Sequence, residues 1–304
     1  MKSPVRSPKR HRDDVLFDRA VLEASRKTPY TEAVKAGWHP LAAVYHFATK
    51  DAAWVTPSER QVRETALVRR ARSAPPPSVY KRTKGRGRSL PMDGRQGEFR
   101  DVLLARRTWR GFGRRPLALA DLGTLLDLTF GVQMIGQAGK GVTALFKTSP
   151  SGGARHPIEA YVLAVRVKNL ARGLYHYSPR SRALHLIQRG ASSARLVSYL
   201  CGQSWFSGAA VLVLMTAVLP RLWWRYEHPR AYRAVLLEAG HLCQTFCLTA
   251  TWLGLAPFCT MALDDSRVER DLKIDGVEEV LVYGVGAGTR PSDGRWVQWP
   301  RRQR

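Results

Sequence analysis

The chain has 304 residues, 44% of them hydrophobic, so it can bury a sizeable core and is not a disordered chain overall. Its formal net charge is +25, which brings nucleic acid, an acidic peptide and a simple arginine bias into consideration. The basic residues are spread along the chain without a helix-turn-helix, zinc-finger or RNP-type motif. We therefore favour arginine bias first, an acidic peptide partner second, and nucleic acid last.

Neither a membrane span nor a secretion signal is expected. The N-terminus is polar and basic, without the apolar core of a signal peptide. The longest apolar stretch, around 231–255, contains Arg233, Glu238, His241 and Gln244, which argues against a transmembrane helix. We expect a cytoplasmic protein with reduced cysteines and no membrane contact.

We expect the N-terminal third of the chain to form a tail, followed by helices and a linker. Residues 1–12 are basic and contain Ser and Pro, which predicts a disordered tail. The spacing of apolar residues predicts helices over 13–27 and 57–72, and a short helix begins at Thr31. Residues 73–97 are rich in Pro, Gly, Lys and Arg, so we expect a linker or an extended arm.

A basic run follows a short helix predicted over 99–106. If 106–110 is extended, Arg106, Thr108 and Arg110 share one face, because side chains alternate along an extended chain. Two guanidiniums and a hydroxyl on one face would suit a phosphate, since Arg offers a planar fork of donors. The residues alone leave a solvated basic run open as the alternative.

The segment 148–157 is the most informative part of the sequence. Pro150 and Ser151 precede Gly152 and Gly153, neither of which has a Cβ, so the backbone there can approach a ligand closely. Backbone N–H groups and a hydroxyl would suit an anion or the polar edge of a flat cofactor. Composition alone favours an ordinary tight turn into a strand.

From residue 119 onward, helices alternate with strands, which indicates an α+β fold. The helix over 229–253 is apolar on most sides, so protein is expected to enclose it, for which a subunit interface is one possibility. His241 on this helix is interpreted as a core group rather than a site residue. Helices are predicted over 119–130, 192–200, 229–253 and 265–272, and strands over 161–167, 173–177, 183–187, 209–219 and 279–285.

The four cysteines include no CxxC pair. Cys243 and Cys247 are four residues apart on a predicted helix and could in principle hold a metal. Such residues are more often small buried hydrophobic groups, so we expect no metal site. The other two are Cys201 and Cys259.

Several motifs, in this order, resemble nitroreductase-fold flavoproteins. The run 106–110, with Phe112 and Pro116, is similar to the opening of that family. Further segments resemble the narrower SagB-type (McbC-like) dehydrogenases, and the likeness covers about residues 45–288. These segments are 45–50, 75–81, 150–161, 173–177 and 231–244.

The resemblance implies a nitroreductase-like fold, with a mainly antiparallel central sheet flanked by helices. It also implies a homodimer that holds FMN at the subunit interface. In the loop 258–262 the family's usual Pro and Gly are replaced by Cys259 and Met261. The residues that it places at the cofactor are Arg106, Arg107, Thr108, Arg110, Pro150, Ser151, Gly152, Gly153, Cys259, Thr260, Met261 and Arg290.

On this basis we divide the chain into four parts. These are a disordered basic tail (1–12), an N-terminal helical region with a linker (13–98), a nitroreductase-like FMN domain (99–290) and a basic C-terminal tail (291–304).

The resemblance further implies an enzyme that matures a ribosomally synthesised peptide by oxidising azolines to thiazoles or oxazoles. In azoline oxidases a Lys-Tyr pair lies near the flavin, and the matching positions here are Arg225 and Tyr226. Arg is effectively always protonated, so Arg225 cannot readily act as the base. This departure leaves room for reduction of a dehydroamino acid, in which Tyr226 would donate a proton.

The expected partners are a precursor peptide, which could carry an acidic leader, a second copy of the chain, and a peptide-modifying complex. A generalist nitroreductase, a flavin-less peptide-binding subunit and a nucleic-acid-binding protein are the alternatives. An aromatic peptide groove is a further possibility, with core packing as its alternative. Its residues would be Trp205, Phe206, Trp223 and Trp224.

Overall fold

The computed structural model describes residues 29–50, 78, 80, 88–91, 94–137 and 143–293. The predicted tail 1–12 and the helices predicted over 13–27 and 57–72 lie outside these residues, as do most of the predicted linker and of the C-terminal tail.

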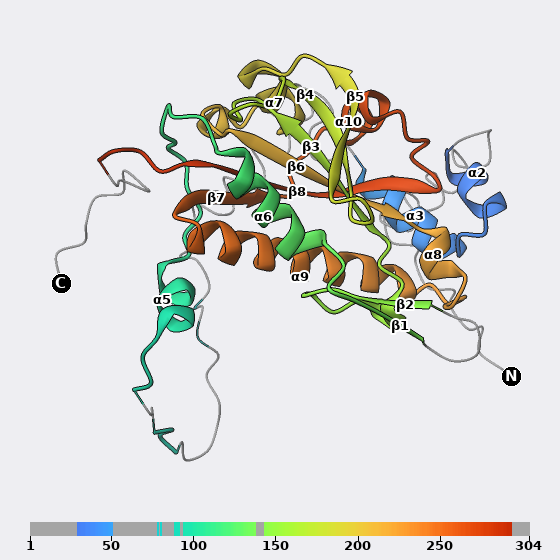
Figure 1. Ribbon diagram of the computed structural model, residues 1–304. Helices are drawn as coiled ribbons and strands as arrows, with labels where there is room; N and C mark the ends of the chain where they lie inside the picture. The colour runs from blue at the N-terminus through green and yellow to red at the C-terminus, as the bar shows by residue number, and fades with distance from the viewer. Residues whose placement is uncertain are drawn as a thin grey trace, which may run out of the picture.

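A six-stranded antiparallel sheet forms the centre of the fold, with the strand order β5-β4-β3-β6-β8-β7 (Figure 1). The central strand β6 is buried almost throughout, which explains its continuous apolar sequence. The strands are β3 Ile158–Ala164, β4 Gly173–Ser178, β5 Ala183–Arg189, β6 Val211–Val218, β7 Leu255–Thr260 and β8 Glu279–Thr289.

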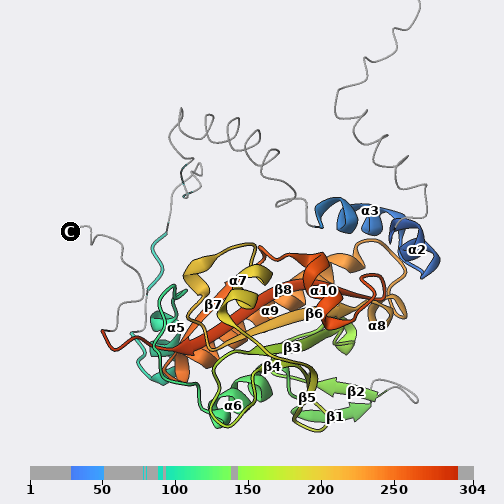
Figure 2. The ribbon, with the colours of Figure 1, turned by 90° about the horizontal axis from the view of Figure 1, so that it is seen from above.

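Helices cover both faces of this sheet (Figure 2). The helices α6 and α9 lie on one face, and α7 and α10 lie on the other. The sheet and helices therefore confirm the α+β architecture that the sequence predicts, with a mainly antiparallel central sheet flanked by helices. The helix bounds are α6 Leu119–Phe130, α7 Ser193–Tyr199, α9 Ala231–Trp252 and α10 Asp265–Leu272.

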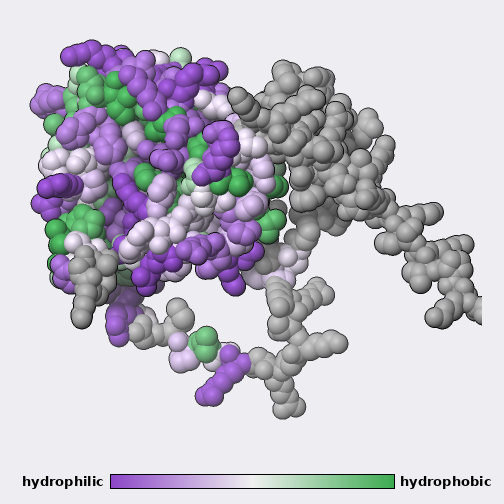
Figure 3. Space-filling view, turned by 90° about the vertical axis from the view of Figure 1, so that its right-hand side faces the viewer, coloured by the Kyte–Doolittle hydropathy of each residue, from purple (hydrophilic) through white to green (hydrophobic). Residues whose placement is uncertain are grey.

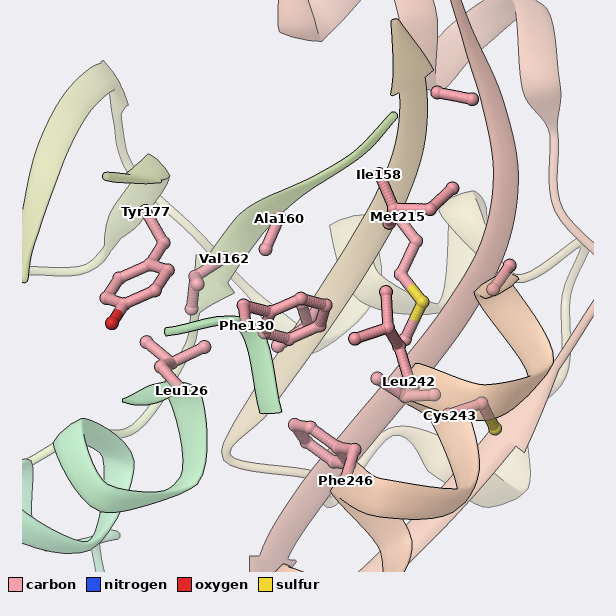
Figure 4. Close-up of a cluster of buried hydrophobic side chains, with 14 of the residues drawn as sticks. Leu126, Phe130, Ile158, Ala160, Val162, Tyr177, Met215, Leu242, Cys243 and Phe246 are labelled. Atoms are coloured by element: carbon pink, nitrogen blue, oxygen red, sulfur yellow. The ribbon is translucent and has the colours of Figure 1, made fainter. Parts of the chain in front are cut away.

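Successive residues of the strands enter two separate cores, as the alternation of a β-strand requires. Val162 and Met215 face α6 and α9, where Phe130 and Phe246 lie beside them (Figure 4). Leu163 belongs to the second core, under α7 and α10.

Two N-terminal helices, α2 (Pro29–Lys35) and α3 (Pro40–Thr49), pack against the sheet domain. The indole N–H of Trp38 donates to the carbonyl oxygen of Val277 at 2.9 Å. His46 Nδ1 is hydrogen-bonded to the hydroxyl of Tyr232 at 2.7 Å. The second helix was not among the sequence predictions, although Pro40 stands at its first turn, where proline is favoured.

Strand β7 corrects the sequence prediction, which made 258–262 a loop. Pro257 lies inside this strand and pairs with Ala287 of β8. The strand is at the edge of the sheet, where a residue without an N–H group is tolerated. The partner strand β8 also runs beyond its predicted end at 285, to Thr289.

The remaining elements are short. The hairpin β1–β2 was not predicted, and its turn lies outside the described residues. None of the described helices is both long and apolar enough to cross a membrane. The face shown in Figure 3 is mainly hydrophilic, with hydrophobic side chains in small separate groups. The bounds are α5 Glu98–Ala105, β1 Met134–Gln137, β2 Thr143–Phe146, η1 Gly152–Ala154, η2 Ser204–Phe206 and α8 Pro220–Trp223.

Candidate functional site

The Ser-Gly-Gly loop, residues 150–156, is fastened to the middle of α9. Ser151 Oγ donates to Glu238 Oε2 at 2.6 Å and accepts from the backbone N–H of His156 at 2.9 Å. On the next turn of α9, His241 Nδ1 lies 3.3 Å from the carbonyl oxygen of Pro150. His241 is exposed, so its interpretation as a core group was wrong.

The two glycines of this loop have different surroundings. Gly153 has a φ of +60°, and a Cβ built there would lie 2.8 Å from the hydroxyl of Tyr226 and 2.9 Å from Cδ of Arg225. A Cβ on Gly152 would make only an ordinary contact, 3.5 Å from Cβ of Ala234. The loop and the Arg225–Tyr226 pair, both predicted as site residues, are therefore in contact.

A buried acid–base pair lies under the loop. His156 Nδ1 is 3.8 Å from Glu238 Oε1, and His156 Nε2 is hydrogen-bonded to the carbonyl oxygen of Leu145 at 2.7 Å. Burial raises the pKa of Glu238 to about 7, although the hydrogen bond from Ser151 opposes this. Burial also lowers the pKa of His156 to about 4, with nearby cations adding to the effect.

A cavity of about 1120 Å³ opens beside the loop. Glu159 lies in its wall, where it accepts from His176 Nε2 at 2.8 Å and from Arg221 Nη1 at 2.5 Å. Burial acts to raise the pKa of Glu159, but these hydrogen bonds and the Arg221 charge outweigh it and lower that pKa. The cations that line the cavity are Lys147, Arg155, Arg180, Arg182 and Arg221.

The basic run 106–110 follows α5 directly. Trp109 is buried, and its backbone N–H donates to the carbonyl oxygen of Pro257 at 2.9 Å, which fixes the run to β7. Its neighbours Thr108 and Arg110 are less buried than Trp109. The side chains of Arg106 and Arg110 make no hydrogen bond or ion pair with any residue that the structure describes.

Arg290 packs against Trp109 of this run. Its guanidinium carbon lies 5.5 Å from the centre of the Trp109 ring. Its Nε donates to Leu255 O at 3.0 Å and its Nη2 to Thr251 O at 3.1 Å. These contacts position Trp109, and a phosphate contact by Arg290 stays a prediction.

The loop and the basic run lie at different levels of α9 within one chain. The loop contacts Glu238 and His241, whereas the run is tied through Arg290 to Thr251 at the far end of the helix. Thirteen residues separate Glu238 from Thr251, about 20 Å along a helix. Within one chain these two groups of predicted residues are therefore held to different turns of α9.

The segment 258–262, which the resemblance places at the cofactor, lies at the end of β7. Met261 is 81% exposed, and Thr260 Oγ1 accepts from Gln203 Nε2 at 3.1 Å. Cys259 turns toward α9, where its sulfur and those of Cys243 and Cys247 all lie within 4.8 Å of one another. This grouping was not predicted, because it depends on the packing of β7 against α9.

The residues of the predicted aromatic peptide groove divide between the core and the surface, where Trp205 and Trp224 are exposed. Phe206 is buried and stacks on Phe258, with their ring centres 4.0 Å apart. Trp223 packs edge-on against Trp38 at 6.0 Å. Trp224 is exposed, with the Arg155 guanidinium 5.2 Å from its ring centre. Core packing, the alternative interpretation, holds for Phe206 and Trp223.

The fold and these elements define the class of protein. A profile of the Nitroreductase family matches residues 103–289, and the chain therefore belongs to that family. Members of this family are oxidoreductases and generally use FMN.

Two proteins are similar to this chain in sequence over part of its length. A Methanocaldococcus jannaschii protein named as a nitroreductase is 31% identical over 177 residues, which are 58% of this chain and 85% of that protein. The trifolitoxin-processing protein TfxB of Rhizobium leguminosarum bv. trifolii is 33% identical over 135 residues, 43% of this chain. The match spans only 36% of TfxB.

Solved structures agree on the fold. A nitroreductase structure from Anabaena variabilis has 25% identity and a TM-score of 0.54, covering 64% of this chain and 38% of that one. The Escherichia coli microcin synthetase McbBCD complex, with truncated pro-MccB17 bound, contains a chain with 20% identity and a TM-score of 0.52. That match covers 78% of this chain and 95% of the other.

Proposed function

We propose that this chain is an FMN-dependent oxidoreductase that modifies a ribosomally synthesised peptide. The contact between the Ser-Gly-Gly loop and Tyr226 is the observation that carries the proposal, because it joins a cofactor loop to a proton-donating group. The similarity to a trifolitoxin-processing protein and the fold shared with a microcin synthetase chain support a peptide substrate.

The basic run 106–110 fits the phosphate of FMN. No described residue occupies the guanidinium donors of Arg106 and Arg110, and Thr108 adds a hydroxyl between them. Arg107 is a weaker candidate, because its Nη1 already donates to two carbonyl oxygens of the chain. FMN would supply hydride transfer, while the protein holds the cofactor and orients the peptide.

A homodimer would bring the loop of one chain to the basic run of another. In a single chain these groups are about 20 Å apart along α9, as counted above. The exposed sides of α5 and α9 carry Phe99, Leu104 and Leu237, which a second copy would cover. The enclosure expected for α9 would then come from the partner subunit.

The cavity beside the loop fits an acidic part of the peptide. Five cations line it together with Glu159, which is already paired with His176 and Arg221. Lys147 is mostly enclosed, and burial lowers its pKa, with only partial compensation from Glu159 and Glu238. A carboxylate entering the cavity would offset this excess of positive charge.

The direction of the reaction depends on proton transfer at Tyr226. Oxidation of an azoline removes a proton and a hydride, and Arg225 is a poor base for the proton. Reduction of a dehydroamino acid adds a hydride and a proton, which the hydroxyl of Tyr226 could supply. Azoline oxidation remains our leading proposal, with this reduction as the alternative.

The first test is flavin binding by the full chain. We expect a yellow protein with about one FMN per chain, which Arg106→Ala with Arg110→Ala abolishes because the phosphate donors are lost. Arg114→Ala, in the same basic segment, is the matched control and should retain FMN. A colourless wild-type protein that takes up no FMN would instead favour the flavin-less peptide-binding subunit.

The second test identifies the substrate. The enzyme is incubated with a precursor peptide rich in Cys, Ser or Thr that is encoded nearby, already cyclised to azolines or dehydrated, and the peptide mass is measured. Loss of two hydrogen atoms indicates oxidation and gain indicates reduction. Membership of the nitroreductase family makes a generalist enzyme the competing candidate, which would reduce nitroarenes with NAD(P)H and leave the peptide unchanged.

A further inference from the structure

Three cysteine side chains form a cluster between α9 and β7. Cys243 and Cys247 lie one helical turn apart on the buried side of α9, and Cys259 faces them from β7. The three sulfur atoms all lie within 4.8 Å of one another. Among the residues that the structure describes, no other group of three His, Cys, Asp or Glu side chains is close enough to share a cation.

The spacing is near that of a thiolate metal site. A Zn–S bond of about 2.3 Å places the sulfurs of such a site about 3.8–4.0 Å apart. Small rotations of the three side chains would therefore complete the geometry. Two ligands come from a rigid helix and the third from a strand, which holds them in place independently of any loop.

The surroundings can accommodate a cation and its thiolates. Cys243 and Cys247 are nearly closed off from solvent, whereas Cys259 is half-buried and leaves an entry path. Tyr283 lies close enough to Cys243 and Cys259 to act on both thiols, and it would form part of the surroundings of a shared ion. Arg106 acts electrostatically on Cys259 and would offset part of the negative charge.

We propose that Cys243, Cys247 and Cys259 bind one thiolate-preferring cation, Zn²⁺ or Cu⁺. Soft sulfur ligands select these ions over Mg²⁺ or Ca²⁺. The helical pair alone is too few ligands, so the third cysteine is what makes the site. The proposal does not depend on flavin chemistry, because the three thiols alone would hold the ion.

The test uses the full chain, produced without a chelator and with its cysteines reduced. We expect about one equivalent of Zn or Cu by elemental analysis. After chelation, Cd²⁺ should restore binding and produce ultraviolet charge-transfer absorbance of sulfur–cadmium bonds, which saturates at one equivalent. Both readouts are independent of enzyme activity and of FMN content.

Substitutions locate the site. Cys259→Ser and Cys247→Ser should each lose the metal and most of the charge-transfer band, while Cys201→Ser, outside the cluster, should retain both. Circular dichroism checks that each variant is folded. Wild-type protein that has three reduced thiols yet gives no band with Cd²⁺ would overturn the proposal, as would a disulfide within the cluster after purification under mild conditions.

Discussion

Glu238 and His156 are two buried groups whose effects on stability oppose each other. The raised pKa of Glu238, about 7, gives stability that is complete below its ordinary value near 4.5 and is lost as the pH rises to about 7. The lowered pKa of His156, about 4, gives stability that is complete above its ordinary value near 6.5 and is lost as the pH falls to about 4. The two contributions partly cancel between these limits.

Single substitutions should reveal each contribution. Glu238→Gln keeps an acceptor for Ser151, and we expect its stability, relative to wild type, to rise with pH between about 4.5 and 7, where wild type loses the Glu238 contribution. Asn tolerates the positive φ of +44° at residue 156, which makes His156→Asn a suitable substitution. Relative to wild type, its free energy of unfolding should fall as the pH rises between about 4 and 6.5, by up to about 1.4 kcal/mol per pH unit. Urea unfolding at several pH values measures both, and variant curves parallel to wild type would contradict the prediction.

Individual site residues could be predicted from the sequence where the residues that act together are close along the chain. The Ser-Gly-Gly loop could be found from its residues, and its contact with Arg225 and Tyr226 lies where the family resemblance led us to expect a site. Glu238 was not recognised as a buried partner of Ser151, because that contact spans 87 residues. The cysteine cluster was missed for the same reason, since Cys259 reaches α9 only in the folded sheet.

The loop is the element whose conformation the site depends on most. Gly153→Ala would put a Cβ against Tyr226 and Arg225 at a position with positive φ, so we expect a loss of about 1–2 kcal/mol in stability. Displacement of Tyr226 should also lower turnover of the peptide. Gly152→Ala is the matched control, because its Cβ finds an ordinary contact 3.5 Å from Ala234. Urea unfolding and turnover that are the same in the two variants would contradict this account.

Elements with strong periodicity could be predicted, and those set by their neighbours could not. The helix α6 has its predicted bounds, and the central strand β6 lies within its predicted run. The edge strand β7 was obscured by Gly254 and Pro257, which normally punctuate turns. The hairpin β1–β2 is short and largely exposed, so its sequence carries little hydrophobic alternation.

At the scale of the whole molecule, the residues that the structure describes leave an apolar surface uncovered on α5 and α9. No residue of α5 is buried, and its Phe99 and Leu104 are exposed near the end of α9. The indole N–H of Trp252 donates to Glu98 Oε1 at 2.8 Å and links the two helices there. The fold could be predicted from the family motifs, but the extent of this surface depends on how α5 sits against α9.

We therefore expect the full chain to be a dimer that Leu237→Glu separates. Leu237 is 63% exposed on α9, and a carboxylate there would have to lose its water in the interface. Because the proposed FMN site needs the loop of one chain and the basic run of the other, the variant should also lose FMN. Light scattering coupled to size-exclusion chromatography and flavin absorbance measure the two effects.

The control for this prediction is Leu186→Glu, which places the same charge on the exposed edge strand β5. It should leave both the dimer and the bound flavin unchanged. Since association depends on protomer concentration, both variants are compared with wild type over a dilution series. A wild-type monomer that holds FMN at every concentration would mean that one chain completes the site. That result would contradict the proposal that the loop and the basic run of the FMN site come from different chains.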